Sequence, residues 1–194
     1  MFSLPTSITI QDKEYAIRNN GDYRMVMDCF LALTDSDLTT DERIMAGLMI
    51  FYDDFNSVDD VLSVDDMEPF VLQMYWFMNC GESNDNAKHS PKLIDWEQDS
   101  QMIFSAVNRV AGKEVRLEEY MHWWTFMGYY MAIGECTLSF IVGIRNKMIK
   151  GKKLEKHERE FKRDNPQYFR WNKKPVDDAE ADKLFNELWN NKEE

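Results

Sequence analysis

One stretch, residues 117–151, carries the densest run of apolar and aromatic side chains in the chain and then turns basic. Its sequence is LEEYMHWWTFMGYYMAIGECTLSFIVGIRNKMIKG. Apolar residues recur in it at helical spacing, which predicts one helix over about 117–133 and a second over about 137–150. Gly134 marks the break between them, and Gly151 stands where a glycine commonly follows a last helical turn. Because aromatic side chains bury large areas, we expect this helical hairpin at the centre of a core.

The other elements are predicted to be helices, apart from one N-terminal hairpin. Apolar residues alternate with polar ones over 7–17, which is typical of two short paired strands. Three helix starts are indicated by a Ser or Thr followed three residues later by an acid, namely Thr39–Glu42, Ser57–Asp60 and Ser63–Asp66. Helices are also expected after the capping residue Asp22 and over about 66–79 (with Pro69 in its first turn), 95–110 and 153–162. The predicted fold is mainly α: a multi-helix bundle with a small N-terminal β-hairpin.

Length and composition favour one domain. The chain has 194 residues, of which 44% are hydrophobic, enough for a sizeable core. We expect a single helical domain over 1–170, with the hairpin at about 4–18, and a tail over 171–194 with a possible amphipathic helix at about 177–190. The polar residues 82–91 are expected to form a loop. Neither a membrane span nor a secretory signal is visible, and three widely spaced cysteines fit a reducing cytoplasm.

The net charge of −12 is distributed unevenly along the chain. Residues 1–100 carry 20 acids and 6 bases, whereas residues 101–194 carry 15 acids and 17 bases. Within 145–174 there are 12 bases and only 4 acids. Such asymmetry favours self-association or docking to a partner of mixed charge. It argues against bulk DNA binding, because most of the surface would repel phosphate.

Motifs for catalysis, cofactors and metals are missing from the sequence. His89, His122 and His157 lack ligand spacing, and there is no CxxC or HExxH pattern for zinc. No GxGxxG, phosphate loop or GxSxG occurs. The paired acids within 53–66 lack the spacing of an EF-hand loop, so helix caps and solvated loops explain them better than calcium. We therefore expect no catalytic residue, no cofactor and no metal site.

The candidate partner surface comes from the same central stretch. Neighbours on a helix point about 100° apart, so Trp123 and Trp124 cannot both face one core, and one should face another element or another chain. Arg145 lies on the apolar side of its helix, which favours a buried or interface ion pair with a carboxylate over an anion site. The predicted partner-binding residues are Trp123, Trp124, Tyr130, Arg145, Lys147, Lys150, Lys152 and Lys153.

Three blocks of the sequence resemble, in order, a bacteriophage family named after gene product fifteen, found in phages and prophages of Gram-positive bacteria. The blocks are LPTSITIQDKEYAIRNNGDYR, KLIDWEQDSQMIFSAVNRVAG, and YMHWWTFMGYYMAIGE followed by IVGIRNKMIKGKKLEKHEREF. The resemblance runs from about 4 to 169 and leaves 172–194 outside it. It implies a tail assembly chaperone that coats the helical tape-measure protein until tail-tube subunits polymerise around it.

The resemblance thus predicts binding, not catalysis, in the host cell cytoplasm, with the tape-measure protein and tail-tube subunits as partners. The 13 methionines suit adaptable apolar contacts, and self-association is left open. One alternative is a structural head–tail or tail component that stays in the virion. A less favoured alternative is a nucleic-acid-binding protein that uses 145–174, where Phe169 and Trp171 lie among the bases. An enzyme is the least favoured.

Overall fold

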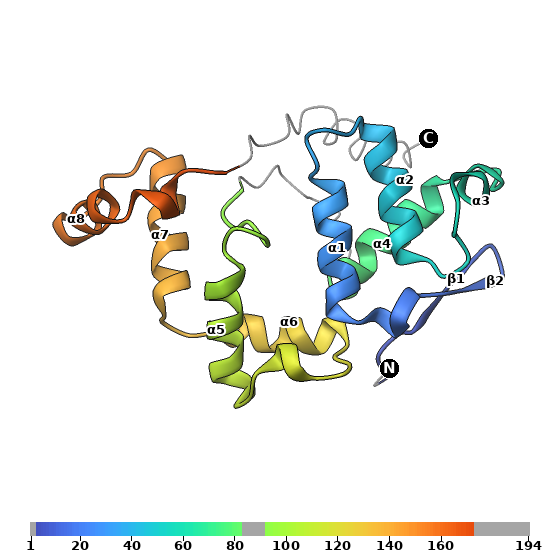
Figure 1. The fold of residues 1–194 in the computed structure, drawn as a ribbon, viewed down its shortest axis with the longest axis horizontal. Coiled ribbons are helices and arrows are strands. Elements are labelled where there is room, and N and C mark those ends of the chain that lie inside the picture. The colour runs from blue at the N-terminus through green and yellow to red at the C-terminus, as the bar shows by residue number, and fades with distance from the viewer. Residues whose placement is uncertain (1–2, 83–91, 173–194) are drawn as a thin grey trace. The chain divides into compact units, whose positions relative to one another are not determined.

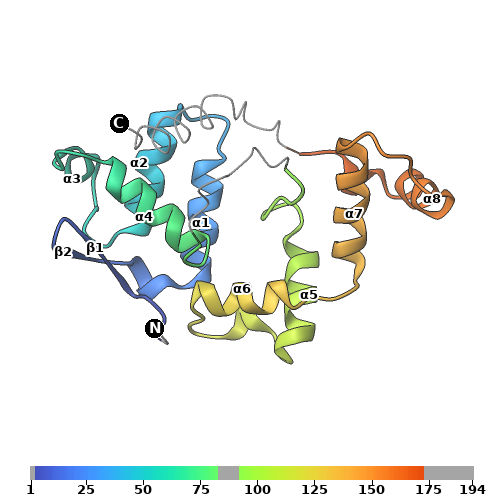
Figure 2. The ribbon, with the colours of Figure 1, turned by 180° about the vertical axis from the view of Figure 1, so that it is seen from behind.

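The fold is helical apart from one hairpin, as the computed structural model shows for the residues it describes, 3–82 and 92–172 (Figures 1 and 2). In order, the elements are β1 (Ser7–Ile10), β2 (Lys13–Ala16), η1 (Arg18–Gly21), α1 (Tyr23–Leu33), α2 (Thr40–Phe51), α3 (Val58–Leu62), α4 (Glu68–Met78), α5 (Ser100–Ala111), η2 (Val115–Leu117), α6 (Trp123–Met131), α7 (Thr137–Ile149), α8 (Lys156–Asp164) and η3 (Pro166–Phe169). The predicted class, mainly α with a small N-terminal hairpin, is confirmed.

The chain divides into two compact units. The described part of the first unit comprises 3–82 and 120–127, and that of the second comprises 92–119 and 128–172, so the boundary falls within α6. A compact unit is not by itself a domain that folds alone, so the single domain over 1–170 stays a prediction. None of the helices in the described ranges is long and apolar enough to cross a membrane.

In the first unit, the hairpin is anchored on the helices. Its turn residues Gln11 and Asp12 have positive φ, a conformation that matches the twist of two paired strands. In the antiparallel register Ile8 pairs with Tyr15, and both side chains are buried. Tyr15 meets Phe70 of α4 edge to face, with ring centroids 4.8 Å apart. An isolated hairpin is marginal in water, and this contact supplies the support it needs.

Helices α1, α2 and α4 lie side by side around the core of the first unit (Figures 1 and 2). The Asp22 side chain caps α1 by accepting from the Arg24 backbone N–H at 2.9 Å, and Thr39 with Glu42 forms the predicted capping box of α2. Fully buried side chains of this core include Ile17, Tyr23, Leu48, Phe51, Tyr52, Met74, Phe77, Trp123 and Phe126.

In the second unit, α5 and α7 pack together through Ile103, Val107, Leu138, Ile141 and Ile144, all buried. Helix α7 occupies the predicted range and ends as predicted. Gly151 has φ +62°, its N–H donates to the Met148 carbonyl at 3.1 Å, and the Lys152 N–H donates to the Lys147 carbonyl at 2.8 Å. These two bonds form a Schellman motif, which satisfies carbonyls that the helix leaves free.

Three predicted helix starts are wrong. Helix α6 begins at Trp123 instead of about 117, because the backbone around Met121 is paired with Asp22 and Tyr23. Helix α5 begins at Ser100 instead of 95, because the Asp95 carboxylate accepts from the two following backbone N–H groups at 97 and 98 and so holds a turn. Helix α4 begins at 68, and Ser63, predicted to cap it, instead ends α3.

Two predictions fall on residues that the structure does not describe. These are the loop at 82–91, apart from Glu82, and the helix at about 177–190.

Candidate partner-binding surface

The two neighbouring tryptophans hold α6 against the end of α4. The Trp123 side chain is 1% exposed and its Nε1–H donates to the Met78 carbonyl at 2.8 Å. Trp124 is half-buried, and its Nε1–H donates to the Phe77 carbonyl at 2.9 Å. Carbonyls in the last turn of a helix lack partners within it, and the indoles satisfy two of them. Both indoles thus bind the end of α4 in their own unit, and the buried Trp123 offers nothing to a partner.

His122, next to this pair, is a structural histidine. Its Nε2 lies 2.9 Å from the Pro5 carbonyl, and its Nδ1 accepts from the Trp124 N–H at 3.1 Å. The neutral ring with the proton on Nε2 satisfies both contacts. Burial lowers the pKa of His122, against the raising effects of the Pro5 carbonyl and the Asp22 carboxylate. The site therefore favours the neutral imidazole, and the ring packs in the core of the first unit.

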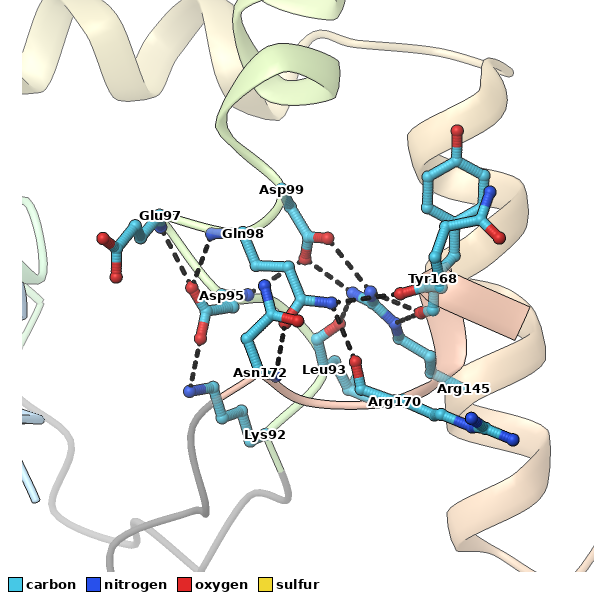
Figure 3. Close-up of polar contacts among 11 residues, drawn as sticks. Lys92, Leu93, Asp95, Glu97, Gln98, Asp99, Arg145, Tyr168, Arg170 and Asn172 are labelled. Atoms are coloured by element: carbon cyan, nitrogen blue, oxygen red, sulfur yellow. Dashed lines mark hydrogen bonds and ion pairs between the residues drawn. The ribbon is translucent and has the colours of Figure 1, made fainter. Parts of the chain in front are cut away.

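Arg145 lies at the centre of a buried polar cluster in the second unit (Figure 3). The side chain is 4% exposed, and its two terminal nitrogens donate to the Asp99 carboxylate at 2.6 and 3.0 Å. Its remaining hydrogen bonds go to the backbone carbonyls of Leu93, at 2.9 Å, and Tyr168, at 2.9 and 2.6 Å. The predicted buried ion pair with a carboxylate is confirmed. Because it is buried, Arg145 is removed from the predicted partner surface.

The same cluster fixes the chain that follows η3. The Gln98 side-chain amide donates to the carbonyls of Gln167 and Arg170 and accepts from the Asn172 N–H (Figure 3). The guanidinium carbon of Arg145 lies 4.4 Å from the centroid of the Trp171 ring. This stacking engages the aromatic residue that the nucleic-acid alternative would use as a stacking platform.

Beyond α7, the exposed cations border a hollow of about 580 Å³ in the second unit. We call it the basic hollow; it is lined by Lys153, Leu154, Arg159, Lys162, Arg163 and Pro166. Leu154 and Pro166 supply the apolar part, and four cations surround it. Within the described residues, neither Lys153 nor Lys162 has an acidic partner within ion-pair distance. The hollow therefore offers apolar contact together with unpaired positive charge.

The remaining predicted residues are distributed around this hollow or away from it. Lys153 lines it, whereas Lys150 and Lys152 are exposed nearby in sequence but do not line it. The Lys147 ammonium is bound to the Glu158 carboxylate at 2.6 Å. Tyr130 is half-buried against Trp96, with ring centroids 5.5 Å apart.

Sequence reasoning missed three residues of the hollow on α8. Arg159, Lys162 and Arg163 recur at spacings of three and four and so share one face of that helix. Along 153–162 acids and bases alternate in the sequence, which hides the face that the cations share. The positions of the cations alone, taken at helical period, would have indicated a basic face.

The first unit carries a surface of opposite character on α3. Val58 and Leu62 lie one turn apart and are 47% and 59% exposed, while Val61 between them is buried. Asp59 beside them is exposed. We call Val58, Asp59 and Leu62 the acidic ridge; the exposed acids Asp53, Asp54, Asp65 and Asp66 flank it in sequence. As predicted, Asp60 is a capping partner, with Ser57 donating to its carboxylate at 2.8 Å.

Within the described ranges, no group of three or more His, Cys, Asp or Glu side chains could hold a metal ion. A family model described as bacteriophage Gp15 protein matches residues 2–169. No curated protein and no solved structure matches the chain.

Proposed function

The chain belongs to the bacteriophage Gp15 family, and from that premise we propose that it is a tail assembly chaperone acting in the host cell cytoplasm. Its client would be the tape-measure protein, with tail-tube subunits replacing it on the client as the tail grows. The proposed activity is binding, without a catalytic step. The observation that supports it best is the basic hollow, an exposed site that combines apolar contact with positive charge.

The chemistry of the hollow favours one kind of client segment. A helix with a narrow apolar stripe flanked by acids would place aliphatic side chains against Leu154 and Pro166 and carboxylates beside Lys153 and Lys162. The family resemblance implies that the tape-measure protein is a long amphipathic helix, which would expose apolar surface until the tube covers it. The net charge of −12 would keep the chaperone–client complex soluble.

The small size of the hollow suits a client that must later be released. A contact confined to the six lining residues would be weak by itself, because a stable interface involves roughly 20–30 residues on each side. Many copies along one client would add their contacts through effective concentration, and tube subunits could displace them one at a time.

Co-expression with the tape-measure protein tests the proposal. The wild-type chain should increase the soluble fraction of the tape-measure protein and co-purify with it. The variant Lys162→Glu with Leu154→Asp should lose both effects while keeping its fold by circular dichroism. Lys156→Glu is the control for the Lys162→Glu part, because it makes the same charge change on α8 at a residue that does not line the hollow. A tape-measure protein equally insoluble with and without the wild-type chain would overturn the proposal.

Mass spectrometry of purified phage particles separates the chaperone from a structural tail component. A chaperone should be absent from mature tails, because the completed tube encloses its client. Stoichiometric amounts of the chain in washed particles would favour the structural alternative instead.

A further inference from the structure

We propose that copies of this chain associate head to tail, with the acidic ridge of one copy seated in the basic hollow of the next. Both surfaces belong to described residues, and they lie in different units. The inference uses the hollow of the proposed function but does not depend on the tape-measure protein being the client.

The ridge has the shape and chemistry of an insert. Val58 and Leu62 project on one side of α3, and Leu62 leaves 59% of its surface in water. Removing apolar side chains from water is favourable, so covering this pair would stabilise a contact. Asp59 stands beside them without an ion pair to any described cation. The ridge therefore exposes apolar side chains and a carboxylate that a partner could cover and pair.

The hollow offers both an apolar contact and positive charge. Its volume of about 580 Å³ lies within the roughly 300–1,000 Å³ of typical ligand sites. Leu154 and Pro166 would contact the aliphatic pair, and Lys162 and Lys153 would face the carboxylate of Asp59. The same chemistry that we assign to the client segment thus occurs within the chain itself.

The charges of the two units support association between copies. The described residues of the first unit carry 16 acids and 4 bases, whereas those of the second carry 11 acids and 14 bases. Opposite net charges would attract the first unit of one copy to the second unit of another over distances of about a Debye length, near 10 Å at 0.1 M salt.

The symmetry of such a contact has a consequence. Ridge and hollow are different surfaces, so each bound copy keeps one free ridge or one free hollow for the next. Contacts of this heterologous kind produce rings or open series, the smallest ring being a reciprocal pair in which each copy's ridge occupies the other's hollow. Client binding would compete with the ridge for the hollow, so the client would shorten the series.

Sedimentation velocity of the purified full chain tests the inference. At 50 mM salt, the weight-average mass should rise with protein concentration above that of the monomer, and 500 mM salt should reverse much of the increase. A chain that stays monomeric at every concentration and at low salt would overturn it.

Three variants identify the surfaces. Leu62→Lys should weaken association at least about tenfold, since it replaces apolar contact with a charge of the same sign as the cations of the hollow. Asp59→Lys and Lys162→Glu should each weaken it roughly fivefold, the scale of an exposed ion pair. Asp37→Lys and Lys156→Glu are controls with the same charge changes at other exposed positions, and they should leave association unchanged.

Mixing gives the decisive measurement. Asp59→Lys and Lys162→Glu proteins, each weakened alone, should associate more strongly when mixed, because the reversed ridge of one matches the reversed hollow of the other. No recovery on mixing would overturn the pairing of these two surfaces. Because no client is present, failure here would leave the chaperone proposal to its own co-expression test.

Discussion

Among the glycines, Gly21 has the least room for a side chain. Its φ is +76°, and an added Cβ would lie 2.6 Å from Phe77 Cζ and 3.1 Å from His122 Nε2. We expect Gly21→Ala to lower the free energy of unfolding by about 2–4 kcal/mol, from backbone strain and overpacking together. Gly112→Ala is the matched control: φ is +71° but no atom lies within 4 Å, so about 1 kcal/mol is expected. Equal losses in urea denaturation would contradict the packing contribution.

His122 should make stability depend on pH. Burial lowers its pKa in the folded chain, whereas an unfolded histidine titrates near 6.5. Its contribution is therefore complete above pH 6.5 and is lost as pH falls from there toward the folded pKa. We expect the urea midpoint to fall between pH 7.5 and 5.5, and to fall less in His122→Gln. The same decrease in both proteins would assign the titration to other groups.

The three cysteines should differ in reactivity. Burial raises the pKa of Cys29 strongly and raises that of Cys80 to about 11. At Cys136, partial burial raises the pKa, but hydrogen bonds from Ser139 and the charge of Arg109 outweigh it, so the net shift is downward. Because the thiolate is the reactive form, a disulfide reagent at pH 8 should modify Cys136 first. Cys136→Ser should remove the fast phase; if the fast phase persists, another thiol is the reactive one.

At the scale of the helices, the buried ion pair of α7 should dominate the stability of the second unit. Arg145→Ala would leave the Asp99 carboxylate, 1% exposed, without its cation. Breaking a buried pair from one side costs about 3–5 kcal/mol. Arg163→Ala removes an exposed pair with Asp164 and should cost about 0–1 kcal/mol. Chemical denaturation of both variants measures their free energies of unfolding. Similar losses would mean that another group, such as water or a shifted side chain, takes over the Asp99 carboxylate.

Helix ends were predictable where their chemistry is local. The capping box at Thr39 and the glycine after α7 depend on residues within a few positions of each other, so the sequence contains their cause. The start of α6 was not predictable, because it depends on Asp22 pairing with the chain about 100 residues later. Helical period alone extended that helix by about two turns.

The candidate site divides in the same way. The ion pair of Arg145 was predicted because its position on an apolar helix face demands a partner, although the identity of Asp99 came only from the fold. The basic hollow was missed because α8 and the chain before it form it together. The 100° offset between helix neighbours predicts that Trp123 or Trp124 faces outward, but the Trp123 indole N–H donates to a carbonyl of α4.

For the whole molecule, the charge asymmetry read along the sequence corresponds to the two units. The division by sequence halves and the division by compact units differ at 92–100 and at 120–127. Both nevertheless concentrate the net negative charge in one part. Charge pattern and fold class were thus accessible from the sequence. The division into two units could not be predicted from the sequence, because residues 120–127 belong to the first unit although they follow the start of the second.

The cluster around Arg145 also sets where the gene can be shortened. The family match ends at residue 169, but Trp171 and Asn172 complete the cluster beyond it. An expression clone that ends at the family boundary would remove the indole from the guanidinium face and two of the three hydrogen bonds of the Gln98 side chain, those with Arg170 and Asn172. Keeping three more codons, for residues 170–172, would preserve the contacts that hold the segment after η3 against Gln98 and Arg145.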